Sequence, residues 1–319
     1  MSKRWILALL AALVLYLGLG LAFGLRDLAG TLARLSGWWW LLACLAALCS
    51  HGLLFQRWQF YLRQIGFPLP WPPSARIYAA GLALIAAPGR SGEALRGLWL
   101  QRRHGFPLQV GVSVTLAERL ADLASALLVL SWGFGQKVWL AMLVGFLTLA
   151  AGGWLLTHPR VLRHWEQALE GLPLRPRWRG VVRLLREALL TMGRVRQLMK
   201  PWPLLVGTLL ACGCWMLEAA ALQGVYAALG TPLSLQQTAV IRTATGLGGV
   251  LSLLPAGLGT SEATAIGLAM AYGAPRSAAL AATLVLRIAT VAVPCLIGMV
   301  ALFSQRDLTA NRPAGEPQR

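Results

Sequence analysis

The sequence predicts an all-α polytopic membrane protein with about six full transmembrane helices and two re-entrant helical hairpins in an inverted repeat. Of its 319 residues, 57% are hydrophobic and only 13% are charged, whereas a soluble domain carries about 25% charged residues. The apolar residues run in long blocks, without the alternation of a membrane β-barrel. Two Pro/Gly-rich breaks interrupt these blocks, and irregular backbone at membrane depth requires burial in protein or an adjoining wet cavity.

We expect one integral membrane domain over residues 1–319. Its first helix, 5–25, is too long for a typical signal peptide. The rest of the chain divides into repeat one at 38–132, a linking helix at 137–156, a basic cytoplasmic segment at 157–201, repeat two at 202–303 and a disordered tail at 304–319.

Repeat one begins with a full helix over about Trp38–Tyr61, opened by tryptophans that prefer the headgroup level. The next apolar run, Ile77–Ala87, is too short to span a bilayer, which takes about 20 residues. We therefore predict a re-entrant hairpin that turns at Pro88 and returns over Ser91–Leu100. A full helix over about Pro107–Trp132 completes the repeat.

Repeat two shows the same order of elements. A full helix covers about Trp202–Leu229, and Thr238–Leu254 then leads into the second break, Pro255–Gly259. The return half-helix is Ser261–Tyr272, and a last full helix covers about Pro275–Phe303.

The two repeats align at a nearly constant offset. The pattern Gly105-x-Pro107 with Thr115-Leu116-x-x-Arg119 recurs as Gly273-x-Pro275 with Thr283-Leu284-x-x-Arg287, 168 positions later. Glu93 and Glu262 match at 169, and Gly66 and Gly230 at 164. Ordered matches of this kind indicate an internal repeat more strongly than any single match does.

The distribution of arginine sets the expected orientation. With the basic segment 157–201 in the cytoplasm, both termini fall inside. The ends of the first hairpin also fall inside, where Arg57, Arg63, Arg76, Arg102 and Arg103 flank it. The second hairpin then enters from outside, so the repeats have inverted topology, as in many alternating-access carriers.

Several ionisable residues lie at the expected membrane depth: Arg90, Glu93, Arg96, Glu118, Arg119, Asp122, Glu218, Glu262 and Arg287. Each isolated charge in lipid costs about 2.5–3.5 kcal/mol, so these groups should pair. The repeat predicts the pairs Glu93–Arg119 and Glu262–Arg287. Arg119 and Asp122 share a helix face, whereas Glu118 points away from Arg119 and needs another partner.

These charges have a functional interpretation and several structural ones. Helix N-termini at Ser91 and Ser261 suit a phosphate. The guanidinium groups of Arg119 and Arg287 suit bidentate hydrogen bonds to its oxygens. The glutamates neutralise those arginines, carry protons or hold a cationic headgroup. Three structural alternatives compete with this interpretation. Each serine is a helix N-cap with a glutamate in the first turn, or the Arg/Glu pairs only hold the re-entrant elements together. In the third, the Arg96 side chain extends to the membrane interface.

Three motifs resemble the lysylphosphatidylglycerol synthase transmembrane (flippase-like) domain family. They are Pro88-Gly-Arg-Ser-Gly-Glu-Ala-Leu-Arg96, Glu118-Arg-Leu-Ala-Asp122 and Pro255-Ala-Gly-Leu-Gly-Thr-Ser-Glu262. The chain departs from the family pattern at Ala256, where a second glycine is usual, and we expect this to relax the turn slightly. The resemblance covers about residues 5–303 and implies movement of lipid between leaflets, without the soluble synthase domain of the long members.

We therefore expect a lipid flippase or transporter in a bacterial inner membrane. Its partner is a lipid with an anionic or zwitterionic headgroup. The residues expected to line the substrate site are Arg90, Glu93, Arg96, Glu118, Arg119, Asp122, Gly257, Gly259, Ser261, Glu262 and Arg287. The alternatives are a membrane enzyme or subunit in (glyco)lipid modification, and a scaffold recruited through the basic segment.

The net charge and the absence of further motifs indicate which other ligands and partners to expect. We expect no catalytic residue, cofactor or metal, because the four histidines are scattered and no nucleotide-binding loop appears. The net charge of +18 suggests contact with anionic headgroups rather than nucleic acid. Apolar residues at helical spacing over Val181–Val195 suit a basic helix lying on a membrane surface, or a solvated linker helix. Homo-oligomer formation is left open.

Overall fold

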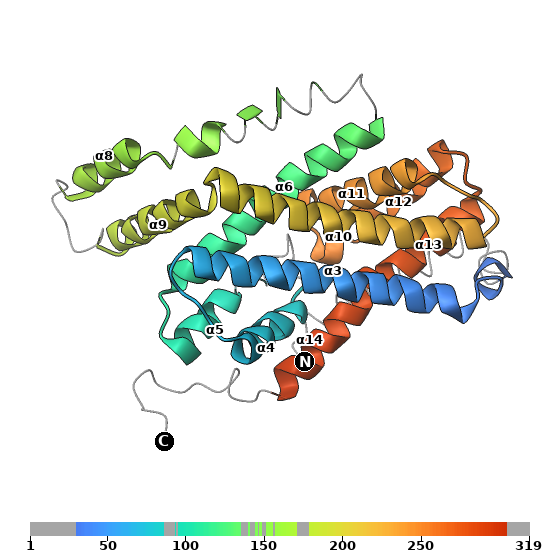
Figure 1. The fold of residues 1–319 in the computed structure, drawn as a ribbon, viewed down its shortest axis with the longest axis horizontal. Coiled ribbons are helices and arrows are strands. Elements are labelled where there is room, and N and C mark those ends of the chain that lie inside the picture. The colour runs from blue at the N-terminus through green and yellow to red at the C-terminus, as the bar shows by residue number, and fades with distance from the viewer. Residues whose placement is uncertain are drawn as a thin grey trace.

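The computed structural model describes residues 30–85, 93, 95–134, 140, 144–145, 147–148, 151–155, 157–170 and 179–304. Every regular element in these ranges is helical, which confirms the predicted all-α membrane class (Figure 1). The expected first helix at 5–25, the turn at Pro88, most of the linking helix at 137–156 and the tail beyond Ser304 lie outside the described residues.

Four long elements occupy the places where the sequence predicts full helices. Helices α3 (Gly37–Gln64) and α10 (Pro201–Ala228) and the run Arg276–Ser304 are long and apolar enough to cross a membrane. Helix α6 (Leu108–Phe134) is nearly as long, but it carries the charged motif that begins at Glu118. The predicted total of about six depends further on the segments at 5–25 and 137–156.

Helices α3 and α10 pack side by side in opposite directions (Figure 1). Tyr61, near the end of α3, lies against Gly207 near the start of α10, where a β-carbon would be 1.8 Å from the tyrosine oxygen. At the other end, the Trp39 ring packs on Gly224. Glycine at these two positions allows the close contact of α10 with the aromatic rings.

The shorter helices form two pairs. Helices α4 (Trp71–Leu82) and α5 (Leu95–His104) contact each other in repeat one. In repeat two, α11 (Leu235–Leu251) contacts α12 (Thr260–Ala271), with the short helix η3 (Pro255–Gly257) between them. Each pair also packs on the last long helix of the other repeat, α4 against α14 and α11 against α6.

The chain turns in the same way at equivalent positions of the two repeats. Gly66 and Gly230 follow α3 and α10 with φ of +80° and +74°, and Gly105 and Gly273 follow α5 and α12 with φ of +68° and +90°. A left-handed glycine after a helix lets the chain close the last turn with backbone hydrogen bonds. The glycine pairs that align in sequence therefore share one backbone conformation.

The last long helix of repeat two is interrupted. It consists of α13 (Arg276–Arg287), a π-helical segment, η4 (Ile288–Ala292), and α14 (Val293–Ser304). Pro294 lacks a backbone N–H, so the regular ladder cannot continue through it. Single π-helical turns of this kind are frequent at functional sites.

Apolar side chains gather in a separate cluster in each half. One cluster joins α3, α4, α5 and α6 around Trp58 and Tyr61, and another joins α3, α10, α12 and α13 around Tyr226 and Leu280. Helix α3 contributes to both clusters and therefore links the two halves.

The basic segment forms helices α8 (Pro159–Glu170) and α9 (Arg179–Leu198), which contact each other at one side of the molecule (Figure 1). The helix expected over Val181–Val195 is therefore present. It packs on α6, where Ser113 Oγ donates a hydrogen bond to the Thr191 carbonyl at 3.2 Å. Its outer face leaves large apolar side chains exposed, of which Leu184 is 70% exposed.

Helices α5 and α6 touch backbone to backbone. A methyl group on Gly111 would lie 2.1 Å from the Gly97 Cα, a distance that no Cβ contact tolerates. This crossing places α5, which follows Glu93, next to the charged motif of α6.

We predict that Gly111→Ala separates α5 from α6 and lowers the free energy of unfolding by about 1–3 kcal/mol, the usual effect of overpacking. The matched control is Gly267→Ala, because Gly267 is also helical and has no atom within 4 Å of an added methyl. Thermal unfolding of the purified protein in detergent measures both. Equal stability of the two variants would show that the crossing tolerates extra volume.

Candidate substrate-binding site

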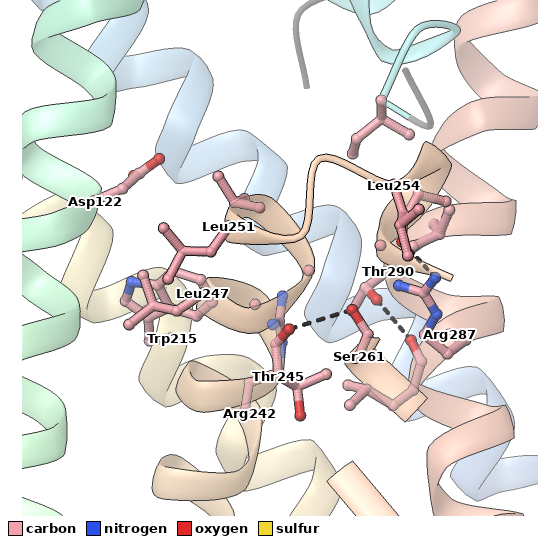
Figure 2. A pocket seen from close by; sticks show the side chains of 18 of the residues that line it. Asp122, Trp215, Arg242, Thr245, Leu247, Leu251, Leu254, Ser261, Arg287 and Thr290 are labelled. Carbon is pink, nitrogen blue, oxygen red and sulfur yellow. Dashed lines mark hydrogen bonds between the residues drawn. The ribbon is translucent and has the colours of Figure 1, made fainter. Parts of the chain in front are cut away.

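A cavity of about 370 Å³ lies between α6, α10, α11 and the π-helical segment of repeat two. Among the described residues, the charged side chains that line it are Arg119, Asp122, Arg242 and Arg287. Figure 2 shows Asp122, Arg242 and Arg287. This volume falls within the roughly 300–1,000 Å³ typical of ligand pockets. Arg119 belongs to repeat one and Arg287 to repeat two, so both repeats contribute equivalent arginines to one cavity.

In repeat two, the predicted pair forms. Arg287 Nε lies 2.8 Å from Glu262 Oε1, and Arg287 Nη2 donates a hydrogen bond to the Ala256 carbonyl at 2.5 Å. Glu262 is only 1% exposed and also accepts a hydrogen bond from the Gly259 N–H at 2.7 Å. The carboxylate therefore ties Arg287 to the first turn of α12, where the helix dipole favours a negative charge.

The alternative in which Ser261 is the N-cap of its half-helix is wrong. Gly259 precedes α12, and Ser261 lies within the first turn with its hydroxyl donating to the Thr245 carbonyl at 3.3 Å. A β-carbon on Gly249 would lie 2.4 Å from Ser261 Oγ, so this serine fills the space between α11 and α12.

The backbone of the second break is strained at Ala256. Ala256 adopts φ of +54°, a left-handed conformation that an L-residue rarely takes. The expectation that alanine relaxes the turn is therefore wrong, because its side chain adds strain there. The Arg287 hydrogen bond to the Ala256 carbonyl holds this conformation.

In repeat one, the predicted pair belongs to a longer chain of charges. Arg119 Nη2 lies 2.7 Å from Glu93 Oε2, and Arg119 Nη1 lies 3.2 Å from Asp122 Oδ2. Asp122 Oδ1 in turn accepts from Arg57 Nη1 at 2.7 Å. Arg57 is buried, whereas the sequence placed it only among the arginines that flank the first hairpin. It joins α3 to the charged face of α6.

Arg96 is the partner that Glu118 requires. Its Nη2 lies 2.8 Å from Glu118 Oε2 and 3.1 Å from Glu93 Oε2. The guanidinium also lies over the rings of Trp58 and Tyr78, at 4.6 and 5.3 Å from their centroids. Arg96 is only 3% exposed, so the alternative in which its side chain extends to the membrane interface is wrong.

A further ion pair joins α10 and α11. Arg242 Nε donates to Glu218 Oε2, and the guanidinium lies 4.8 Å from the centroid of the Trp215 ring. The sequence marked Glu218 as an intramembrane charge without giving it a partner. Arg242 was missed, although it is an arginine inside the apolar run that leads to the second break.

The structure divides the predicted site residues by position. Arg119, Asp122, Gly257, Ser261 and Arg287 line the cavity. Glu93 and Glu262 pair with its arginines, and the Gly259 N–H holds Glu262. Arg96 and Glu118 line a neighbouring pocket of only about 20 Å³. Arg90 lies outside the described residues.

The arginines and the carboxylates of the site lie at different depths, and this difference determines the chemistry of the cavity. Arginines face the cavity, whereas Glu218 and Glu262 are more deeply buried than the guanidinium groups they neutralise. A guanidinium has five N–H donors, so an arginine that binds one carboxylate can still donate to a phosphate oxygen. The guanidinium groups in the cavity wall are therefore neutralised and still have donors for an anion.

The fold and the cavity define an α-helical integral membrane protein with a charged cavity between two similarly built halves. The chain belongs to the family of the lysylphosphatidylglycerol synthase TM region, whose model matches residues 5–298. This confirms the resemblance drawn from the three motifs. The family is one of membrane proteins linked to lipid modification or transport.

Relatives of similar length occur in Methanothermobacter thermautotrophicus. One UPF0104 membrane protein is 27% identical over 260 residues, covering 74% of this chain and 75% of the relative. Another is 24% identical over 251 residues, covering 70% of this chain and 71% of the relative.

We predict that Glu118→Leu lowers the free energy of unfolding by about 3 kcal/mol, because it leaves Arg96 buried with one acidic partner fewer. The double variant Arg96→Met/Glu118→Leu should recover most of this loss, since apolar residues replace a buried ion pair at little cost. Denaturation in mixed detergent micelles measures both. If the double variant were less stable than Glu118→Leu, Arg96 would stabilise the fold mainly through its contacts with the Trp58 and Tyr78 rings, and not through the ion pair.

Proposed function

We propose that the protein is a lipid flippase that moves a phospholipid or polyprenyl-linked lipid headgroup between leaflets through the central cavity. The observation that carries this proposal is that Arg119 and Arg287, at equivalent positions of the two repeats, line one cavity. Buried charges within a membrane protein mark substrate or ion pathways by default.

The arrangement of the halves supports alternating access. Helices α3 and α10 occupy equivalent positions and run antiparallel, as expected when one repeat is inverted relative to the other. The short helices of each repeat pack on the long helix of the other. We interpret the short pairs as re-entrant hairpins, and relative movement of the repeats would open the cavity to each side in turn.

Apolar side chains next to the cavity provide a place for the lipid tails. Leu251 is 78% exposed, Leu254 is also exposed, and both line the cavity at the second break. A headgroup bound to the arginines would leave its acyl chains beside these leucines, in the hydrocarbon of the bilayer. A lipid is therefore a better occupant than a fully polar solute.

We predict that Arg119→Gln and Arg287→Gln each lower the rate of lipid translocation at least about tenfold, because each removes a charge-assisted contact with the headgroup. The measurement uses the protein in liposomes with fluorescent lipids, whose headgroups are quenched only in the accessible leaflet. The lipids tested should include phospholipids and polyprenyl phosphates.

The matched control is Arg276→Gln, which removes an exposed arginine from the same helix as Arg287. Thermal unfolding of each variant separates loss of transport from loss of fold. Absence of protein-dependent translocation for every lipid tested would reject the flippase. A changed lipid species in membranes that contain the protein would instead favour an enzyme or subunit of lipid modification.

We also propose that α9 rests on the cytoplasmic surface of a bacterial inner membrane, with both termini on that side. Leu184 and its exposed apolar neighbours would enter the headgroup region, while Arg183 and Arg186 meet anionic lipids. Each basic residue near such a surface contributes about 1 kcal/mol. This contact would fix the basic segment without a protein partner.

For α9, we predict slower amide hydrogen exchange in nanodiscs that contain phosphatidylglycerol than in nanodiscs of phosphatidylcholine alone. The variant Arg183→Gln/Arg186→Gln should lose this difference, because it removes two contacts with anionic lipids. Helix α10 serves as the internal reference. Equal exchange of α9 in both membranes would indicate a solvated linker helix.

A further inference from the structure

The wall of the cavity is cationic. Of the residues that the structure describes, three arginines, Arg119, Arg242 and Arg287, line it together with one carboxylate, Asp122. The remaining partners, Glu93, Glu218 and Glu262, are absent from the lining. A ligand therefore meets guanidinium groups first, and the neutralising carboxylates lie behind them.

Arg242 is held in a position that leaves donors for a ligand. Its Nε donates to Glu218, and its flat face lies against Trp215. Within the part of the chain that the structure describes, the terminal nitrogens of Arg242 donate no hydrogen bond to protein. In Figure 2, Arg242 and Arg287 lie on either side of Ser261 and Thr290.

The same contacts disfavour a cationic group. A quaternary or primary ammonium is bound by an aromatic face or by a carboxylate. Trp215 is the aromatic residue that lines the cavity in the described part of the chain, and Arg242 already lies over its ring. Asp122, the carboxylate in the lining, is bound by Arg57 and Arg119. An added cation would meet three arginines at close range.

We propose that the cavity selects a lipid headgroup with a net negative phosphate and no cationic group, and that Arg242 and Arg287 bind this phosphate together. The proposal rests on the lipid-transport function proposed above and narrows its substrate class. It excludes zwitterionic and aminoacylated headgroups as preferred ligands. Bidentate recognition of phosphate oxygens by arginine is the chemistry involved.

The first experiment measures binding to the full-length protein in detergent by isothermal titration calorimetry. The probes are short-chain phosphatidylglycerol, short-chain phosphatidylcholine and inorganic phosphate. We expect phosphatidylglycerol to bind at least about tenfold more tightly than either of the others. Equal binding of phosphatidylcholine would overturn the charge preference, and equal binding of inorganic phosphate would overturn the assignment to a lipid.

The second experiment tests the residues. Arg242→Gln should weaken phosphatidylglycerol binding about tenfold, because one charge-assisted contact is lost. The variant Arg242→Gln/Glu218→Gln should show the same loss without leaving a buried carboxylate unpaired, which separates binding from stability. Arg276→Gln is the control. Unchanged binding in both Arg242 variants would overturn the proposal.

Failure of the two proposals can be told apart. If phosphatidylethanolamine and phosphatidylcholine are translocated as fast as phosphatidylglycerol, the flippase function stands and the headgroup selectivity is wrong. If no lipid is translocated but phosphatidylglycerol binding depends on Arg242 and Arg287, the anion site stands and the transport function is wrong.

Discussion

The pairing of buried arginines with carboxylates is the constraint on which the rest of this structure depends. Removing one member of a buried pair typically costs about 3–5 kcal/mol, because the other charge is left without a partner. Each of the five arginines in the described core contacts an acidic side chain: Arg57, Arg96, Arg119, Arg242 and Arg287. The helices must therefore meet in an arrangement that completes every pair.

A close helix contact and a helix break bring the partners of these ion pairs together. The glycine contact between α5 and α6 brings Arg96 and Glu93 to the charged face of α6. The break after α11 allows α12 to begin at the point where Glu262 meets Arg287. Long uninterrupted helices would place these groups on separate elements at different depths, and some charges would then face lipid unpaired.

The two repeats share their chemistry but differ in the number of acids. Glu118 and Asp122 of repeat one correspond to Leu286 and Thr290 of repeat two, 168 positions later. Repeat one consequently holds its arginines in a network of several carboxylates, whereas Arg287 pairs with Glu262 and a backbone carbonyl. Each arginine that faces the cavity has a carboxylate partner.

The sequence by itself determined the helical membrane class, the motifs that recur at a nearly constant offset, and the pairs Glu93–Arg119 and Glu262–Arg287. These features depend on composition, on the lengths of apolar runs and on the offset between recurring motifs. All three are properties of the linear sequence and can be read without knowing the fold. Only the tertiary structure decided that Arg57 pairs with Asp122, that Arg96 pairs with Glu118, and that Arg242 in the cavity wall pairs with Glu218 behind it. The partners in each of these pairs lie on different helices. The packing of the helices decides which carboxylate each arginine contacts, and sequence spacing does not encode this packing.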